Sequence, residues 1–372
     1  MTASEIVEFV VGALLLLAVS FDLFQSVVLP RPAVHRVQLA RLVVRPMWRV
    51  WRWIFGRGAR VDRSEARLAA FAPLALISLF AIWGFAIIIA YSLMIYGVRD
   101  EFRPALNDYV TCFYVSGTTL VPLAFGDFVP EQALARVLIF MESATGVGVA
   151  ALAITLLFEL YGSFRSREES VVALDALAGA PPSAVQLLET AKERGMDDIL
   201  KETFDEWRTW SAMVLESHLA YPLLVYFRSS HDNEAWINSF GAVMDAAALV
   251  ISSTDDDAKG AAKLMFTVGN HFVEDITWAL RLKTSPDPII ERSEYTAALA
   301  RLRTAGYKVV DGDASWTKFS HFRSKYASTL NLMAQLLMAP PAQWVGDRSY
   351  LPHRQRPRRR RLPARTAPRS AS

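Results

Sequence analysis

The chain has a single cysteine, Cys112, among its 372 residues. One cysteine cannot form a disulfide within a chain, and it cannot supply the set of thiolates that a structural zinc site needs. Cys112 also lies in a stretch that we expect to be packed, whereas reactive cysteines are partly exposed. Disulfide frameworks and thiolate metal sites are therefore excluded, and catalysis by a thiol is not expected.

The sequence also lacks the short motifs of the common enzyme classes. It contains no serine nucleophile elbow, no phosphate-binding loop and no pair of acids spaced for catalysis. No glycine fingerprint follows a strand-like segment, which argues against a nucleotide-binding domain of the Rossmann type. His271, Glu274 and Asp275 share one face of an expected helix, but a second histidine pair is missing, and we predict no metal site. We expect no enzyme activity and no bound cofactor.

Long apolar segments are present, in a chain that is 52% hydrophobic with a mean hydropathy of +0.22. They cover residues 6–29, about 68–96 and about 132–161, and each reaches the roughly 20 residues that a helix needs to cross a bilayer. From Glu168 onward we find no segment long and apolar enough to cross, and apolar residues recur there at helical spacing. We predict an all-α membrane protein with three transmembrane helices and an all-helical C-terminal domain.

The expected organisation has five parts. Residues 1–30 form an N-terminal transmembrane helix, and residues 31–67 form a basic cytoplasmic or interfacial segment. Residues 68–164 form a two-span domain with a membrane-dipping loop at 107–130, followed by a helical cytoplasmic domain at 165–348. The arginine-rich tail, 349–372, has too few apolar residues to fold and is expected to be disordered.

Positive charge is concentrated in two blocks. The net charge of the chain is +3. Residues 31–67 contain ten arginines and two acids and carry a charge of +8, and the tail from Ser349 also carries +8. By the positive-inside rule, the first block is cytoplasmic and the N-terminus lies outside. The arginines that follow the third span give the same orientation. We expect a multi-pass protein of the plasma (inner) membrane with its C-terminal domain in the cytoplasm.

Within the first basic block, residues 36–55 have the pattern of an amphipathic helix. Four arginines share one face of it: Arg41, Arg45, Arg49 and Arg52. Tryptophans lie mostly away from that face, which suits the anionic inner surface of a membrane. A voltage sensor also carries spaced arginines, but Pro46 and the tryptophans argue against that alternative. For the segment from Arg31 to Arg67 and for the tail, we expect anionic lipids as partners rather than nucleic acid.

The segment between the second and third spans, residues 109–130, has the sequence YVTCFYVSGTTLVPLAFGDFVP. Its first half has residues at the spacing of one helical face. Its second half contains Pro122, Gly126 and Pro130, which would interrupt a helix. The segment is too short and too polar for a full crossing. Non-helical backbone at membrane depth is tolerated only where it is buried in protein or lines water. We predict a hairpin that dips into the membrane as a helix and leaves it as extended backbone.

This segment and its flanking spans resemble the pore-loop potassium channel family, in which a pore helix precedes a T-x-G-[YF]-G-D selectivity filter and an inner helix with a glycine hinge. The corresponding filter residues are Pro122, Leu123, Ala124, Phe125, Gly126 and Asp127. Gly146 lies about twenty residues further on, close to the hinge of that family. The extra first span and helical tail resemble a bacterial subgroup. The resemblance implies a homotetramer around one pore for K⁺ or another monovalent cation.

A filter of this kind replaces the water around K⁺ with rings of backbone carbonyls, which point inward only where alternate residues adopt positive φ. Gly126 does so without steric strain, but Ala124 replaces the second glycine, and a left-handed alanine costs about 1–2 kcal/mol. Pro122 replaces a threonine and so removes both a hydroxyl and an N–H. Thr118 and Thr119 offer hydroxyls but precede the filter. The sequence indicates either a channel with a non-standard filter or a channel-derived scaffold or signalling protein that does not conduct.

Two acids lie close to this filter. Asp127 occupies the outer-mouth position of the family, where it can concentrate cations or hold the filter through hydrogen bonds from the pore helix. Glu142 lies inside the third span. It is either a titratable acid of the pore or a buried group bonded to a hydroxyl of Ser116, Ser143 or Thr119.

A second intramembrane acid, Asp22, lies in the first span. An acid at this depth is a functional hypothesis by default, because burying its charge in the bilayer is unfavourable. The alternative is a carboxylate that is hydrogen-bonded to Gln25 or Ser26, or that faces another helix.

Overall fold

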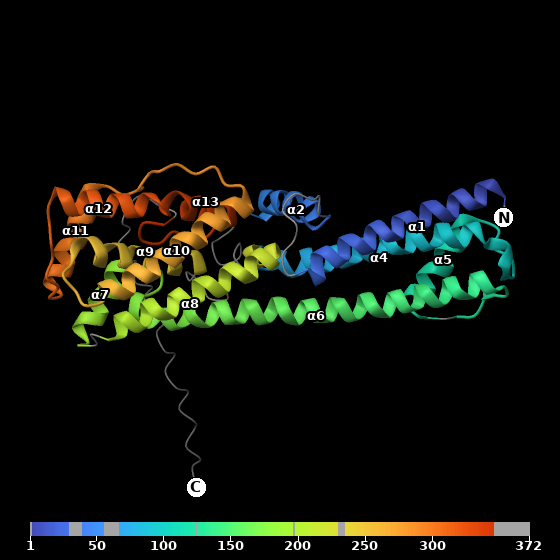
Figure 1. Cartoon of the computed structure of the whole chain (residues 1–372), viewed down its shortest axis with the longest axis horizontal. Coiled ribbons are helices and arrows are strands. Elements are labelled where there is room, and N and C mark those ends of the chain that lie inside the picture. The colour runs from blue at the N-terminus through green and yellow to red at the C-terminus, as the bar shows by residue number, and fades with distance from the viewer. Residues whose placement is uncertain are drawn as a thin grey trace, which may run out of the picture.

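The computed structural model describes residues 2–29, 39–55, 67–123, 125–195, 198–229 and 235–345. Over these residues the molecule is elongated, with a bundle of long helices at one end and a group of shorter helices at the other (Figure 1). Two strands of two residues each form the only sheet in this part of the chain. The prediction of an all-α membrane protein with a helical C-terminal domain is confirmed.

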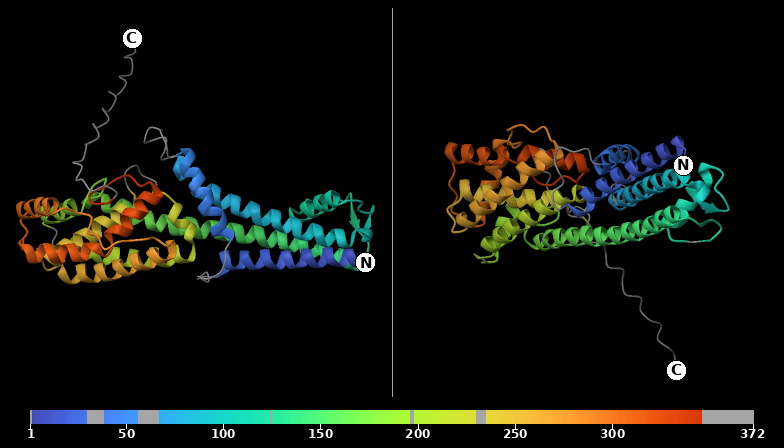
Figure 2. Two further views of the ribbon diagram at one scale, coloured as in Figure 1. Left: turned by 90° about the horizontal axis from the view of Figure 1, so that it is seen from above. Right: turned by 45° about the vertical axis from the view of Figure 1, so that its right-hand side comes forward.

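Three helices of the long bundle contain stretches that are long and apolar enough to cross a membrane. α1 (Ala3–Leu23) continues into one π-helical turn, η1 (Phe24–Val28), and α4 (Phe71–Gly97) packs beside it in the opposite direction (Figures 1 and 2). α6 (Ala133–Ala178) is the third. These helices correspond to the three spans that the sequence predicts.

α5 (Tyr109–Leu120) and an extended segment connect α4 to α6 as the predicted hairpin. The extended segment ends in β2 (Val129–Pro130), which pairs antiparallel with β1 (Phe102–Arg103), the strand that follows the 3-10 turn η2 (Arg99–Glu101). The Glu101 carboxylate accepts a hydrogen bond of 2.9 Å from the backbone N–H of Ala135. That bond satisfies one of the free N–H groups at the start of α6, and it ties the hairpin to this helix.

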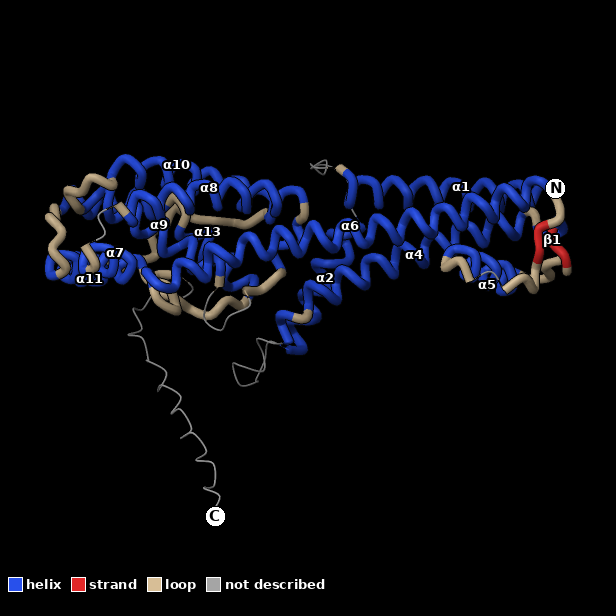
Figure 3. Tube along the Cα trace, turned by 90° about the horizontal axis from the view of Figure 1, so that it is seen from below, coloured by secondary structure: helices blue, strands red, loops and turns tan. Residues whose placement is uncertain are grey.

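α6 is 46 residues long and runs from the hairpin into the C-terminal domain without interruption (Figure 3). At 1.5 Å per residue it spans about 69 Å, more than twice the thickness of the hydrocarbon core of a bilayer. The boundary expected at residue 165 therefore falls inside a continuous helix. The third span and the C-terminal domain share this helix.

The described part of the C-terminal domain contains seven further α-helices and one 3-10 turn. They are α7 (Ala184–Glu193), α8 (Ile199–Ala220), η3 (Pro222–Tyr226), α9 (Trp236–Ser253), α10 (Lys259–Leu280), α11 (Arg292–Thr304), α12 (Asp313–Ser324) and α13 (Ala327–Leu337). α8 packs along α10, and α9 is in contact with α7, α10, α12 and α13. The tail lies outside the described residues.

α9 corrects the expectation that no segment after Glu168 is long and apolar enough to cross a membrane, because its length and composition meet that criterion. All of its residues are buried inside the C-terminal domain. A helix that is apolar on every side must be covered all round, either by lipid or by protein. Here other helices cover it, so α9 is the central helix of the domain.

One buried acid of α9 organises the polar part of this core. Asp245 accepts hydrogen bonds from the guanidinium of Arg323 and from the hydroxyl of Tyr326. Arg323 also donates to the carbonyl oxygens of Pro288 (2.7 Å) and Trp344 (2.6 Å). Buried charges need such partners, since leaving one unpaired costs several kcal/mol. The network joins α9 and α12 to two loop segments. One contains Pro288 and lies before α11, and the other contains Trp344 and lies after α13.

α2 (Leu39–Phe55) is the amphipathic helix that the sequence predicts, but it has two apolar faces. On one face, Trp48 is buried and donates a hydrogen bond of 3.0 Å to the carbonyl oxygen of Leu336 in α13. On the other face, four apolar side chains are at least half exposed: Leu42, Val50, Trp53 and Ile54. The first face therefore holds α2 against the C-terminal domain, and the second is free to contact lipid. Residues 30–38 and 56–66 lie outside the described residues.

Candidate functional site

The pore helix of the hairpin, α5, begins at a side-chain cap. Asp108 accepts hydrogen bonds from the backbone N–H of Thr111 (2.8 Å) and from its hydroxyl (3.1 Å), as N-cap acids commonly do. The helix ends at Leu120, two residues before Pro122, which has no N–H to continue it. The chain then turns, and the N–H of Leu123 donates to the carbonyl oxygen of Thr118 (2.8 Å).

Beyond this turn, Phe125 and Gly126 have no regular secondary structure, and Gly126 has a φ of +78°. This is the left-handed conformation that we expect of Gly126 from the sequence. Ala124, the other residue expected at positive φ, lies outside the described residues. Leu123 and Phe125 are 54% and 64% exposed within one chain, so the rest of the chain leaves more than half of each side chain uncovered.

The two threonines considered as a source of filter hydroxyls lie on the last turn of α5. The hydroxyl of Thr118 donates to the carbonyl oxygen of Val115 (3.0 Å) inside the same helix. Thr119 is half-buried. Both residues therefore belong to the pore helix, and the extended segment begins after them.

Asp127 is exposed, and its carboxylate lies near the hydroxyl of Tyr114 on α5. The two side chains therefore bring the segment after Gly126 close to α5. The Asp127 carboxylate is also accessible, so it can attract cations as well as face α5.

Gly146 lies on α6 where that helix crosses the end of the pore helix. A Cβ at this position would overlap the carbonyl oxygen of Leu120 and come within 2.9 Å of its carbonyl carbon. α6 is a continuous helix through Gly146. In this conformation the glycine therefore permits close packing of α6 against α5, with no break in the helix.

Glu142 is fully buried between α4, α5 and α6. Of the three hydroxyls that the sequence offers, Ser116 is the one that bonds to it, and the same hydroxyl is 3.0 Å from the carbonyl oxygen of Ile88. The second carboxylate oxygen, Oε2, has no hydrogen-bond partner among the described residues. Glu142 thus stands behind the pore helix, away from the exposed filter segment.

Asp22 faces another helix, which is one of the alternatives that its place in the sequence left open. Its Oδ2 accepts a hydrogen bond of 2.8 Å from the indole N–H of Trp83, which is buried in α4. Hydrogen bonds of this kind between membrane helices contribute about 1 kcal/mol each. The bond therefore helps to hold α1 against the two-span domain.

Further polar contacts fix α4 against the hairpin and α6. The hydroxyl of Tyr91 bonds to Thr145 (2.9 Å), and that of Tyr109 bonds to Ser92 (2.7 Å). The Thr145 hydroxyl donates its own hydrogen to the carbonyl oxygen of Met141, one turn earlier in α6 (2.7 Å). Each of these four hydroxyls thus has a partner, and the three helices are joined by side chains as well as by packing.

The inner end of α6 is joined to the C-terminal domain through Arg167, a fully buried residue. Its guanidinium donates to the carbonyl oxygens of Leu224 (3.2 Å) and Phe227 (2.7 Å), and it pairs with the carboxylate of Glu168 (2.9 Å). Its cation lies over the ring of Trp236, 5.2 Å from the centroid. These bonds attach η3, and through it α8, to the helix that continues the third span.

His218 completes this junction. Its Nε2 lies 3.4 Å from the Arg167 guanidinium, and its Nδ1 lies 2.9 Å from the carbonyl oxygen of Val214. Burial and then the adjacent cation lower the pKa of His218 to about 3. The imidazole is therefore neutral at pH 7.

Sequence patterns could not reveal Tyr114, Arg167 or His218 as parts of this arrangement. Asp127 lies on another element than Tyr114, and the carbonyl oxygens that Arg167 reaches, those of Leu224 and Phe227, are far along the chain, so no spacing along a helix or strand links them. Among the described residues, no three His, Cys, Asp or Glu side chains are placed to hold a metal ion together. The Nε2 atom of His271 lies 3.5 Å from the Oδ2 atom of Asp275, one helical turn away, and these two residues make a pair and not a set of three.

Residues 76–162 match the family model described as an ion channel. The matched region covers most of α4, the whole hairpin and the membrane part of α6, and it leaves out α1, α2 and helices α7 to α13. No curated protein and no solved structure matches the chain. The family match and the apolar helices support a multi-pass membrane protein with a channel-like role in ion transport.

Proposed function

We propose that the chain is one subunit of a homotetrameric, potassium-channel-like cation channel with a non-standard selectivity filter. The observation that carries this proposal is the hairpin: a capped pore helix, a turn at Pro122 and an extended limb with Gly126 at positive φ, held between two spans. The ion-channel match covers the same elements. Conduction follows the backbone from Pro122 to Gly126, where carbonyl oxygens take the place of water around the ion.

Four copies around one axis supply what a single chain lacks. The filter segment of one chain is exposed, and so are large apolar side chains of α6 such as Phe140 and Phe158. Apolar area of this extent is covered by lipid or by another subunit. In a tetramer each hairpin forms one quadrant of the filter, and four copies of Asp127 form a ring that attracts cations at the outer mouth.

Gating in this proposal bends α6 near Gly146. The residue lies against the end of the pore helix, so a bend there changes the contact between α6 and α5. Because α6 continues into the C-terminal domain and Arg167 fixes η3 to it, that domain is placed to bias the bend. Residues that act as hinges absorb backbone rotation, and a glycine does so without a side-chain clash.

The proposed orientation places the N-terminus outside and the C-terminal domain in the cytoplasm of a cell with a plasma (inner) membrane. The basic segment from Arg31 to Arg67 and the arginine-rich tail then face the anionic inner leaflet. The free apolar face of α2 supports this part of the proposal, since an interfacial helix buries such a face among lipids.

The second candidate is a channel-derived scaffold or signalling protein that conducts no ions. Pro122 favours it, because a proline at this position provides neither a threonine hydroxyl for the innermost ion site nor an N–H behind the filter. Purified protein in liposomes separates the two. K⁺, Na⁺ or Rb⁺ flux through an intact tetramer supports the channel, and an intact tetramer without any such flux overturns it in favour of the scaffold.

A further inference from the structure

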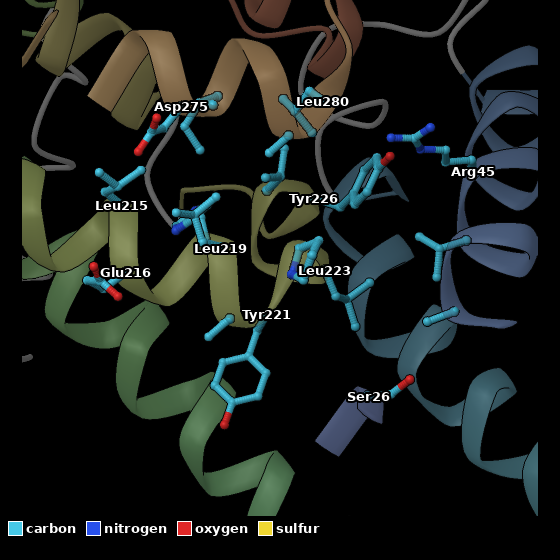
Figure 4. A pocket seen from close by; sticks show the side chains of 18 of the residues that line it. Ser26, Arg45, Leu215, Glu216, Leu219, Tyr221, Leu223, Tyr226, Asp275 and Leu280 are labelled. Carbon is cyan, nitrogen blue, oxygen red and sulfur yellow. The ribbon is translucent and has the colours of Figure 1, made fainter. Parts of the chain in front are cut away.

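A cavity of about 950 Å³ lies where the inner ends of the spans meet the C-terminal domain. Residues of η1, α2, α4, α6, α8, η3 and α10 make up its wall (Figure 4). This volume lies within the range of pockets that hold small molecules. The cavity is separate from the hairpin, and ion conduction makes no use of it.

The middle of the cavity is apolar. Leucine side chains from several elements line it, among them Leu79, Leu156, Leu219, Leu223 and Leu280. Figure 4 shows Leu219, Leu223 and Leu280 converging from α8, η3 and α10 respectively. A lining of this composition favours a hydrocarbon chain over a polar metabolite, because apolar surface is stabilised when it leaves water.

The two ends of the cavity carry opposite charge. Arg45 and the hydroxyl of Tyr226 lie at one end, and Glu216 and Asp275 lie at the other (Figure 4). Burial raises the pKa of Tyr226, and Arg45 and Arg49 oppose that rise, so both guanidinium groups act on the same end. An anionic group is therefore attracted to the Arg45 end and repelled from the opposite one.

The Arg45 end also lies beside the surface that is free to contact lipid. α2, which carries Arg45 and Arg49, exposes Leu42, Val50, Trp53 and Ile54 on its adjacent face. Ser26 of η1, at the end of the first apolar span, lines the cavity, and its buried hydroxyl has no hydrogen-bond partner among the described residues. The Arg45 end is thus at the level where a membrane passes from hydrocarbon to headgroups.

We propose that this cavity binds an anionic phospholipid of the inner leaflet, with an acyl chain among the leucines and the phosphate beside Arg45 and Arg49. The negative end of the cavity fixes the orientation of the lipid. Once bound, the lipid touches α4, α6 and η3 together and therefore stabilises their present arrangement. The proposal uses the orientation given above but not conduction, so the absence of ion flux leaves it standing.

The test uses the purified full-length protein after delipidation in detergent. It is titrated with phosphatidylglycerol or with phosphatidylcholine of identical chains, and bound lipids are counted by native mass spectrometry. We expect about one phosphatidylglycerol per chain to bind, with an affinity at least about tenfold above that for phosphatidylcholine, since each arginine near the phosphate contributes about 1 kcal/mol.

Two kinds of variant test the two parts of the site. Arg45→Glu with Arg49→Glu is expected to remove the preference for phosphatidylglycerol. Arg52→Glu is expected to keep it, because Arg52 is an exposed arginine of the same helix that neither lines the cavity nor acts on Tyr226 as Arg45 and Arg49 do. Ala279→Trp fills the cavity and is expected to abolish binding of either lipid. Leu264→Trp, at an exposed position of α10 outside the cavity, is its control.

Three results would overturn the proposal. Equal binding of the two phospholipids by the unaltered protein removes the assignment of the headgroup. Unchanged lipid counts in Ala279→Trp place the lipid elsewhere on the surface. Displacement of phosphatidylglycerol by an equimolar amount of oleate shows that a free fatty acid is the preferred occupant.

Discussion

Gly146 of α6 lies directly against the carbonyl group of Leu120, the last residue of α5, with no room for even a methyl group between them. Two membrane helices can approach this closely only where one of them lacks a side chain. The contact joins the bending point that we propose for α6 to the end of α5. A movement of α6 at Gly146 therefore displaces the end of α5, just before Pro122.

Gly146→Ala is therefore expected to force α5 and α6 apart. We expect a loss of about 1–3 kcal/mol of stability, the usual range for an added methyl group in a packed core, measured as a lower midpoint of thermal unfolding in detergent. Gly148→Ala is the matched control, because no atom lies within 4 Å of a Cβ at that position. Equal midpoints of thermal unfolding for the two variants would show that Gly146 does not lie against Leu120.

The filter argument predicts a gain of function. Pro122→Thr combined with Ala124→Gly restores the hydroxyl, the N–H and the second glycine that the family pattern has. We expect K⁺ selectivity in liposome flux to appear or to rise. Gly126→Ala in the same background places an alanine at a φ of +78° and should remove the gain. An unchanged selectivity in the double variant would show that these residues are not the filter.

Ser116 and Glu142 predict an asymmetric pair of substitutions. Ser116→Ala leaves both oxygens of a fully buried carboxyl group without a donor, and an unsatisfied buried group costs about 1–3 kcal/mol. Glu142→Gln keeps a polar partner, because its amide donates to the Ser116 hydroxyl while that hydroxyl donates to Ile88. We expect a clear loss of thermal stability in Ser116→Ala and a smaller one in Glu142→Gln.

Ser143→Ala serves as the control for this pair, since Ser143 is a half-buried hydroxyl of the same helix turn. Its stability should stay close to that of the unaltered protein. A larger loss in Glu142→Gln than in Ser116→Ala would mean that the carboxyl group has a role beyond its bond to Ser116.

His218 predicts an acid-sensitive junction between α6 and the C-terminal domain. Its pKa falls from 6.5 to about 3 in the folded protein, so the unfolded chain binds the proton more readily. Its contribution to stability is fully present above about pH 6.5 and is lost as the pH falls from there toward 3. Within this window we expect a slope of up to about 1.4 kcal/mol per pH unit.

The measurement compares unfolding of the unaltered protein and of His218→Gln between pH 7 and 4. Because carboxylates also titrate in this range, the difference between the two proteins isolates the histidine. The stability of His218→Gln should fall less steeply with acid. His321→Gln, which alters an exposed histidine, should follow the unaltered protein. Parallel curves for all three proteins would remove His218 from the acid response.

The sequence by itself determined the three spans, the hairpin between them and the helical nature of the C-terminal domain. These features depend on properties of neighbouring residues: the length of an apolar run, the spacing of apolar side chains, and the placement of Pro122 and Gly126. The same local rules predicted α2, and the φ of Gly126 follows from its place in the filter pattern.

Only the tertiary structure decided which residues meet. The bond of Glu142 to Ser116, the contact of Asp127 with Tyr114 and the cover around α9 all depend on how each helix is rotated and shifted against its neighbours. Apolar periodicity selects the face that a helix buries, but it does not select the partner. The rotation and shift are set by the packing of many side chains at once. For that reason the sequence left three candidate partners for Glu142, Ser116 among them, and named none for Arg167.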